Sequence, residues 1–146
     1  MGITQAVRAK LRENPDAIKI WSTGGGIWRW DQKLDQHYTF EEIKAVVDEC
    51  NMVGIPVWSH AEGYGGALDS AKAGVHLIIH GQTLNDECLD IMAEKGIYFC
   101  PTIQFLNEWF KSRSMPSLLT NSLIRSKPAS EDKSPPSKFI LICLLL

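Results

Sequence analysis

The sequence predicts an α/β fold that contains part of a (β/α)8 barrel. Two observations support this prediction: short apolar strand segments alternate with helical segments, and each of these helices ends at a glycine directly before the next strand. Strands that are apolar along their whole length are typical of parallel sheets, which are buried on both faces. A glycine between helix and strand is typical of the tight connections in α/β proteins. We count four βα units, which is half of a barrel.

The first units are placed by their helix signals. Residues 3–13 are expected to form a helix and residues 17–22 the first strand, and a loop then runs to about Tyr38. Thr39 begins the next helix, because Glu42 three residues later completes a capping box. Apolar residues then recur at the spacing of one helical face, at Ile43, Val46, Val47 and Cys50.

Three further strands are expected at residues 55–60, 75–80 and 97–100. A turn at Gly65-Gly66 and a short helix over residues 67–73 separate the first two of these strands. Asn85 caps another helix, which ends at Gly96. Each helix thus returns the chain to a parallel strand, as the barrel requires.

The character of the chain changes after about Lys111. Residues 112–138 are rich in Ser, Pro and Lys and show no strand–helix alternation. We therefore divide the chain into a partial barrel at residues 1–111 and a low-complexity tail at residues 112–146, for which we expect disorder. The tail is either a natural low-complexity segment or foreign to the fold, such as a frameshifted end, and the abrupt change favours the second interpretation.

Length and composition limit the class of protein. The chain has 146 residues, which suits one domain but is well short of the roughly 250 residues of a complete barrel. Its 45% apolar and 22% charged residues are typical of a globular protein, and a net charge of −2 favours neither a nucleic-acid nor a membrane partner. The four cysteines form no Cys-x-x-Cys pair, and the amino terminus shows no signal-peptide pattern. We therefore expect buried free thiols and a cytoplasmic location.

Two histidines end neighbouring strands in equivalent positions. His60 follows the apolar residues 55–59, and His80 follows residues 75–79. The carboxyl ends of the strands carry the working residues of a (β/α)8 barrel, and a neutral imidazole is a common metal ligand. One histidine at a strand end can equally be held there for structural reasons, but the pair favours a metal site. His76, inside the later strand, is interpreted as structural.

Lys19 lies inside the apolar first strand and is expected to be partly buried. A buried ammonium is costly unless it is paired, neutralised or modified. One solution is carbamylation, which converts the amine into an anionic group that can bridge two metal ions. The alternative is an ordinary lysine whose head group reaches the strand end and meets Asp16 or Glu62.

The loop after the first strand offers residues for a substrate pocket. Aromatic side chains can line such a pocket, and the candidates are Trp28, Trp30 and Tyr38. Glu62, two residues after His60, is assigned to the same pocket, where it can orient a ligand or a water; the alternative is a solvated loop carboxylate. Gly24-Gly25-Gly26 is expected to be a flexible active-site loop, because the spacing of a phosphate-binding loop is absent.

Short motifs occur in a fixed order from about residue 16 to residue 110. They are Ile18-Lys19-Ile20 with Thr23-Gly24-Gly25, residues 40–49, Gly54-Ile55-Pro56-Val57, His60-Ala61, Ala67-Leu68, Ala73-Gly74-Val75, Ile79-His80-Gly81, Gly96-Ile97 and Pro101-Thr102. This series resembles metal-dependent hydrolases of the amidohydrolase superfamily, in the imidazolonepropionase-like and Xaa-Pro dipeptidase-like branch. The resemblance implies that these residues form strands four to seven of the barrel.

The resemblance also implies a metal site and an activity. Lys19 maps to the carbamylated lysine of binuclear members, His60 to the fifth-strand ligand and His80 to the sixth-strand ligand. The implied cofactor is one or two divalent ions, with zinc favoured, that activate a water for attack on an amide. The implied partner is a small amide or dipeptide substrate.

The chain departs from the family pattern at several places. The first-strand His-x-His and the eighth-strand aspartate are absent, and His60-Ala61-Glu62-Gly63 stands where many relatives have His-Ala-His-Gly. No catalytic residue is therefore assigned. We expect a fragment of a metal-dependent hydrolase of carbon–nitrogen bonds in amides, cyclic amides or dipeptides, which is incomplete as a catalyst on its own. The alternative is a non-catalytic half-barrel that binds a partner or a second copy of itself.

Overall fold

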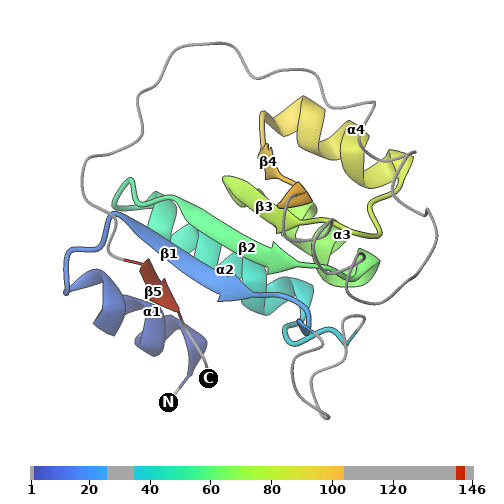
Figure 1. Cartoon of the computed structure of the whole chain (residues 1–146). Coiled ribbons are helices and arrows are strands. Elements are labelled where there is room, and N and C mark those ends of the chain that lie inside the picture. Colours follow the sequence, from blue (N-terminus) through green and yellow to red (C-terminus); the bar gives the residue numbers. More distant parts are fainter. Residues whose placement is uncertain (1, 26–34, 104–140, 144–146) are drawn as a thin grey trace.

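The computed structural model describes residues 2–25, 35–103 and 141–143 of the chain. The described strands form a parallel sheet in the order β4-β3-β2-β1-β5 (Figure 1). The strands are β1 (Ala17–Trp21), β2 (Val57–Ala61), β3 (Leu77–His80), β4 (Tyr98–Cys100) and β5 (Leu141–Cys143). The helices are α1 (Ile3–Leu11), α2 (Phe40–Asn51), α3 (Tyr64–Ala73) and α4 (Asp86–Lys95).

The helices pack in the order of the strands. Helices α2 and α3 contact the sheet at β2 and β3, α1 packs beside α2, and α4 packs beside α3 (Figure 1). Strand, helix and parallel neighbouring strand thus repeat from β1 to β4, which is the repeating unit of a (β/α)8 barrel. The predicted α/β class and the partial barrel are confirmed. Within the described ranges, no helix is long and apolar enough to span a membrane.

One kind of turn joins each of three helices to the next strand. The glycines after these helices have positive φ angles of 67° to 87°, at Gly54, Gly74 and Gly96. The amide after each glycine donates a hydrogen bond to the carbonyl five residues earlier, from Ile55 to Cys50, from Val75 to Ser70 and from Ile97 to Met92. This turn satisfies carbonyls that the helix end leaves open. The first residues of each predicted strand belong to this turn, so the strands begin one or two residues later than expected.

Helix α2 and the core agree with the sequence prediction. Thr39 Oγ1 accepts a hydrogen bond from the Glu42 amide at 3.3 Å, and the Glu42 carboxylate accepts one from the Thr39 amide at 2.9 Å. The predicted apolar face of α2 is buried. It meets the helix-facing side chains of the strands in a core whose largest fully buried apolar side chains include Val7, Ile18, Ile20, Ile43, Val46, Val47, Val57, Val75 and Ile78.

Three buried serine hydroxyls join β2 to α3 and to the residue after β1. Ser22 Oγ lies 2.6 Å from Ser59 Oγ and 2.9 Å from Ser70 Oγ, and the last two atoms are 2.8 Å apart. Each hydroxyl can donate one hydrogen bond and accept another, so the closed triangle satisfies all three donors. This contact holds the carboxyl ends of β1 and β2 at a fixed position over α3.

The sequence prediction of a turn at Gly65-Gly66 was wrong, because both glycines lie in the first turn of α3. A Cβ atom on Gly66 would lie 2.5 Å from Thr23 Cγ2 and 2.7 Å from the Ser22 carbonyl oxygen. Gly66 is therefore needed for the close approach of α3 to the end of β1, rather than for a bend of the chain.

Part of the predicted tail is described, and it forms a strand. Leu141–Cys143 pairs in parallel with β1, so the disorder expected for residues 112–146 does not extend to these three residues. The rest of the tail lies outside the described residues.

Among the described cysteines, Cys50, Cys88 and Cys100 are free thiols. Burial raises the pKa of the Cys50 and Cys88 thiols to about 11, whereas Cys100 is exposed, which the sequence did not predict.

Candidate metal centre

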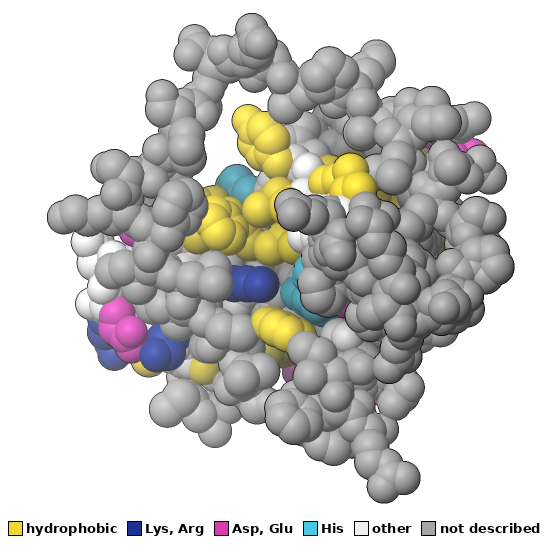
Figure 2. Space-filling view, viewed as in Figure 1, with side chains coloured by type: hydrophobic (Ala, Val, Ile, Leu, Met, Phe, Trp, Pro, Cys, Tyr) yellow, Lys and Arg dark blue, Asp and Glu magenta, His cyan; other side chains and the backbone are white. Residues whose placement is uncertain are grey.

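Alternation along the strands decides which side chains face away from the helices. Ile18 and Ile20 of β1 are fully buried in the core beside the helices. Lys19 and Trp21 therefore point to the opposite face. The register pairs Trp21 with His60 of β2, which places His60 on that same face. Figure 2 views this face and shows hydrophobic and histidine side chains gathered over the sheet.

His60 is held in a fixed position at the carboxyl end of β2. Its side chain is nearly buried, with 3% of the residue exposed. The imidazole stacks on the Trp21 ring, with centroids 4.1 Å apart and planes 15° apart. Its Nε2 atom lies 3.4 Å from the Gly24 carbonyl oxygen. Gly25 packs beside the ring, because a Cβ there would lie 3.5 Å from Nε2. Gly24 and Gly25 thus lie beside the His60 imidazole.

His80 reaches the same face through an unusual backbone conformation. Simple alternation would place His80 with Ile78, which is buried among the helices. His80 instead has a φ of 77°, in the left-handed region, and its ring meets His60 edge-on with centroids 4.5 Å apart. Its Nδ1 atom lies 2.9 Å from Thr102 Oγ1, and Thr102 also has a positive φ of 47°. Strained non-glycine residues of this kind are concentrated at functional sites.

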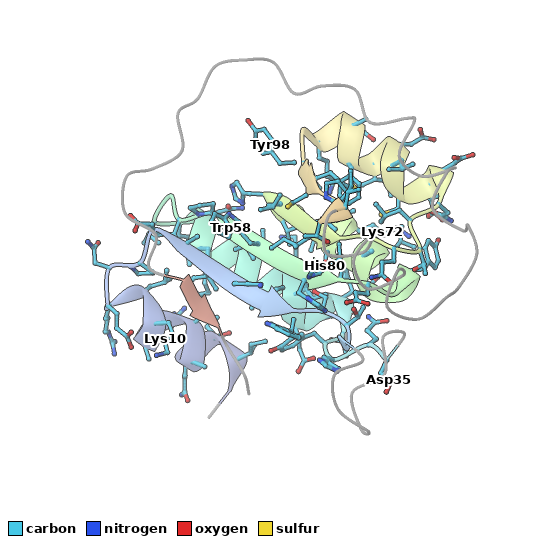
Figure 3. The ribbon with its side chains drawn as sticks, in the orientation of Figure 1. Lys10, Asp35, Trp58, Lys72, His80 and Tyr98 are labelled. Carbon is cyan, nitrogen blue, oxygen red and sulfur yellow. The ribbon has the colours of Figure 1, made fainter. Side chains whose placement is uncertain are left out.

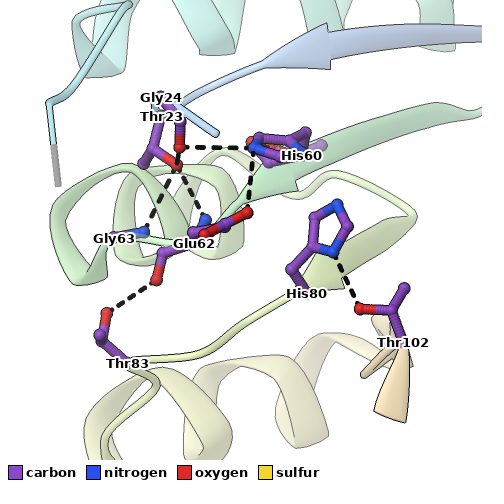
Figure 4. A network of polar contacts seen from close by, with 9 residues as sticks. Thr23, Gly24, His60, Glu62, Gly63, His80, Thr83 and Thr102 are labelled. Atoms are coloured by element: carbon purple, nitrogen blue, oxygen red, sulfur yellow. Dashed lines mark hydrogen bonds and ion pairs between the residues drawn. The ribbon is translucent and has the colours of Figure 1, made fainter. Parts of the chain in front are cut away.

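Glu62 belongs to the same cluster, two residues beyond His60. Its amide donates a hydrogen bond to Thr23 Oγ1 at 2.8 Å, and its carbonyl accepts one from Thr83 Oγ1 at 2.9 Å (Figure 4). Only 4% of Glu62 is exposed, and its carboxylate lies 4.0 Å from His60 Nε2. The alternative of a solvated loop carboxylate is therefore wrong.

The three side chains can hold one metal ion. One ligand atom from each of His60, Glu62 and His80 lies within 4.8 Å of the others. Two ligands of a tetrahedral zinc ion lie roughly 3.4 Å apart, given bond lengths of about 2.1 Å, so small side-chain rotations close the difference. Figure 3 shows His80 at the carboxyl ends of the strands, where a barrel active site is expected.

Sequence reasoning missed the threonines that support this cluster. Thr23 and Thr83 hold the Glu62 backbone, and Thr102 contacts His80. Thr23 begins one motif of the family resemblance and Thr102 ends another, which is the signal that could have drawn attention to them. Their hydrogen bonds join segments that are far apart along the chain.

The comparisons with known proteins agree with this geometry. No protein-family model matches the chain. Ochratoxinase from Aspergillus niger is 30% identical over 100 residues, which cover 68% of this chain and 21% of ochratoxinase. Its crystal structure matches with a TM-score of 0.71 at 27% identity, over 79% of this chain and 26% of the other. A Xaa-Pro dipeptidase with bound methionine matches with a TM-score of 0.72 at 34% identity, over 77% and 28% of the two chains.

A further solved structure, of an amidohydrolase, matches with a TM-score of 0.65 at 31% identity, over 78% of this chain and 28% of the other. The chain belongs to the amidohydrolase superfamily. The resemblance found in the sequence is confirmed. These amidohydrolases are TIM barrels, and this chain spans about a fifth of the curated relative that it matches. It therefore corresponds to one sector of an amidohydrolase barrel.

Two other predicted site residues, Lys19 and Tyr38, lie at different places in this amidohydrolase sector. Lys19 pairs with Trp58, and this pair comes two residues before the pair of Trp21 and His60 along the strands. The Nζ atom of Lys19 lies 5.6 Å from the centroid of the Trp21 ring. Such a position over an aromatic face is favourable for an ammonium. Lys19 thus lies on the same face as His60, beside the Trp21 ring that stacks on His60.

Tyr38 lies beside a separate hollow. A space of about 440 Å³ at the start of α2 is lined by Gln36, His37, Tyr38, Thr39, Phe40, Glu42 and Asp69. None of the three clustered metal-site residues lines it. Trp28 and Trp30 lie outside the described residues, so their assignment to a substrate pocket stays a prediction.

Proposed function

We propose that this chain carries part of the active site of a metal-dependent hydrolase that cleaves carbon–nitrogen bonds. The supporting observation is the cluster of His60, Glu62 and His80 at the carboxyl ends of parallel strands in an amidohydrolase sector. In this fold the working residues come from those strand ends. The names of the relatives, a Xaa-Pro dipeptidase and an ochratoxinase, support amides or dipeptides as the substrate class.

The proposed metal ligands include His60 and His80, and the family resemblance adds a carbamylated Lys19. A set of imidazole nitrogens with carboxylate-type oxygens favours zinc. When bound, the ion supplies Lewis acidity, which acidifies a water and polarises a carbonyl. Thr102 contacts Nδ1 of His80, and a hydrogen-bonding partner of this kind usually orients an imidazole ligand.

The neighbouring residues fix the ligands and shape the substrate site. Trp21 and Gly24 restrict the His60 ring, so the ring does not have to be ordered when the ion binds. We propose that substrate lies over the strand ends, near Glu62 and beneath the loop that carries Trp28 and Trp30. The reducing, cytoplasmic location expected from the free cysteines belongs to this proposal.

We propose further that the 146 residues bind metal but turn over little or no substrate on their own. A catalytic zinc site needs three protein ligands on a rigid scaffold and an open position. The family's His-x-His motif does not occur in this sequence, and no residue is assigned as the base that takes the proton of the water.

The test combines elemental analysis with a hydrolysis assay on the purified full chain. Zinc should be bound by the wild type and lost in the His60→Ala/His80→Ala double variant. N-acyl amino acids and dipeptides that end in proline or arginine should show little or no turnover. Robust turnover would contradict the proposed incompleteness, and unchanged zinc content in the double variant would contradict the metal site.

A second candidate function is self-association, as expected for a half-barrel. Among the described strands, β4 lies at one edge of the sheet, and Tyr98 is 54% exposed there (Figure 3). Ile103, just beyond this strand, is 48% exposed. Exposed strand edges with apolar side chains favour pairing with another chain. Size-exclusion chromatography with light scattering tests this: a dimer that Tyr98→Lys converts to a monomer would support it, and a wild-type monomer would exclude it.

A further inference from the structure

Hydrogen bonds with two threonines hold the backbone of Glu62 on both sides. The Thr23 hydroxyl accepts from the amide of Glu62, and the Thr83 hydroxyl donates to its carbonyl. Thr23 Oγ1 also lies 3.2 Å from the Gly24 carbonyl oxygen, which itself faces His60. The residue that carries the carboxylate and the loop that contacts the imidazole are therefore joined into one rigid unit (Figure 4).

The contact with His60 gives the direction of the Glu62 side chain. Glu62 directly follows β2, and its carboxylate lies 4.0 Å from His60 Nε2, on the same face. His80 reaches that face through its positive φ. Two imidazoles and one carboxylate thus converge, with ligand atoms no more than 4.8 Å apart.

The burial of Glu62 makes a metal-binding role more favourable than a solvent-facing one. Only 4% of Glu62 is exposed, and the exposed fraction of His60 is similar, at 3%. Burying a carboxylate is costly unless it is paired or coordinates a metal. Two imidazoles with one glutamate form an established ligand set for catalytic zinc, which leaves a fourth position open.

Lys19 occupies a different level of the sheet. It pairs with Trp58 rather than with the residue opposite His60, and consecutive pairs on one face are about 6.6 Å apart along a strand. Its Nζ atom lies over the Trp21 ring, 5.6 Å from the centroid. Glu62 supplies an anionic oxygen beside both histidines without any chemical modification.

We propose that Glu62 is the third protein ligand of a single ion held by His60, Glu62 and His80, and that this ion does not require a carbamylated Lys19. The inference rests on the proposed function, because it assigns the ligands of the metal site named there. It differs from that proposal in two ways: Glu62 has a ligand role instead of a role in the substrate pocket, and Glu62 takes the place given there to a carbamylated Lys19.

The test is isothermal titration of the metal-free full chain with Zn²⁺, with and without added bicarbonate. The wild type should bind one zinc ion per chain, with the same affinity in both buffers. Glu62→Gln keeps the size of the side chain but removes the charge, and it should weaken zinc binding by about 100-fold or more, because even outer partners of ligands contribute 10–100-fold. Lys19→Met and the exposed control Glu94→Gln should remain within about threefold of the wild type.

Two results would overturn the inference. One is wild-type zinc affinity in Glu62→Gln. The other is dependence on carbamylation, seen either as loss of binding in Lys19→Met or as a requirement for bicarbonate. Either observation would return the ligand role to the carbamylated lysine. Near-UV circular dichroism checks that Glu62→Gln is folded. If it is not, the Lys19→Met and bicarbonate measurements still decide between the two anions.

The outcome is separable from that of the proposed function. Zinc binding that depends on Glu62 but not on Lys19 would support the inference even if no amide substrate is ever hydrolysed. Conversely, zinc binding that requires bicarbonate and Lys19 would support the metal site of the proposed function while contradicting the ligand role of Glu62. Absence of zinc binding by the wild type would contradict both.

Discussion

The contact between His80 and Thr102 joins two residues with left-handed backbone conformations. Both residues have positive φ angles, and their side chains lie 2.9 Å apart. We predict that Thr102→Val, which keeps the branched shape and removes the hydroxyl, weakens zinc binding about 10-fold, because the His80 ring loses the partner that orients it. Thr102→Ser should restore most of the affinity. Titration with Zn²⁺ measures both variants, and wild-type affinity in Thr102→Val would exclude an orienting role.

His76 gives a prediction about pH at the opposite end of β3. The sequence marked it as structural, and its Nδ1 atom accepts a hydrogen bond from the Val57 amide at 3.2 Å. Burial lowers the pKa of His76 below its ordinary value of 6.5. Protonation of Nδ1 would also break this hydrogen bond. The unfolded chain therefore binds a proton more readily than the folded chain, so this contribution to stability is complete above about pH 6.5 and is lost as the pH falls through the folded pKa.

The measurement is urea unfolding of the metal-free protein at about pH 7.5 and about pH 5. The wild type should be less stable at the lower pH. His76→Gln offers a carbonyl oxygen to the same amide and cannot be protonated in this range. Its loss of stability between the two pH values should be smaller than that of the wild type, and an equal loss would show that other groups carry the effect.

At the scale of elements, the local signals in the sequence were reliable. The capping box at Thr39 and the glycine stops at Gly54, Gly74 and Gly96 were all predicted, because each depends on residues within one turn of the chain. The strands start later than predicted, because the amides that follow the glycines donate hydrogen bonds within these turns. The serine triangle was not predicted, since its hydroxyls come together only after β1, β2 and α3 have packed.

The start of α3 provides a matched pair of glycines for testing close packing. Gly66→Ala would place a Cβ 2.7 Å from the Ser22 carbonyl oxygen, which is backbone and cannot move alone. We expect a loss of roughly 1–3 kcal/mol in the free energy of unfolding, as for other overpacked sites. Gly65→Ala meets only the end of the Gln36 side chain, at 2.9 Å, and replaces a weak helix former. It should change stability by less than about 1 kcal/mol.

Urea unfolding of the two variants separates packing from helix propensity, because both replace a glycine in the same turn. Gly66→Ala should also weaken zinc binding, since it displaces Thr23, which holds the Glu62 amide. Equal stability of the two variants would contradict the close approach of α3 to the end of β1.

At the scale of the whole molecule, the candidate site could be predicted only in part. The positions of His60 and His80 followed from strand ends, which are visible in the sequence. The burial of Glu62, the backbone of His80 and the contact of Thr102 depend on segments far apart along the chain, and no local pattern encodes them. The family resemblance gives Lys19 as the third ligand, whereas the proposal for Glu62 rests on its place in the cluster with the two histidines.

Because the cluster joins β2 to β3, metal binding should stabilise the entire sheet. A ligand that binds only the folded state contributes about 2.7 kcal/mol when its concentration is 100 times its dissociation constant. For a domain of about 100 residues, this corresponds to a rise in Tm of roughly 10–20 °C. Differential scanning calorimetry of the full chain with Zn²⁺ measures this shift. Mg²⁺ should give little shift, because it prefers six oxygen ligands.

The His60→Ala/His80→Ala double variant is the control for this measurement. Its Tm should not respond to Zn²⁺, because only the Glu62 carboxylate of the cluster remains. A rise in Tm equal to that of the wild type would mean that zinc binds elsewhere on the chain. A zinc-dependent rise confined to the wild type would instead show that β2 and β3 are held together by the ion, because the two histidines lie on these neighbouring strands.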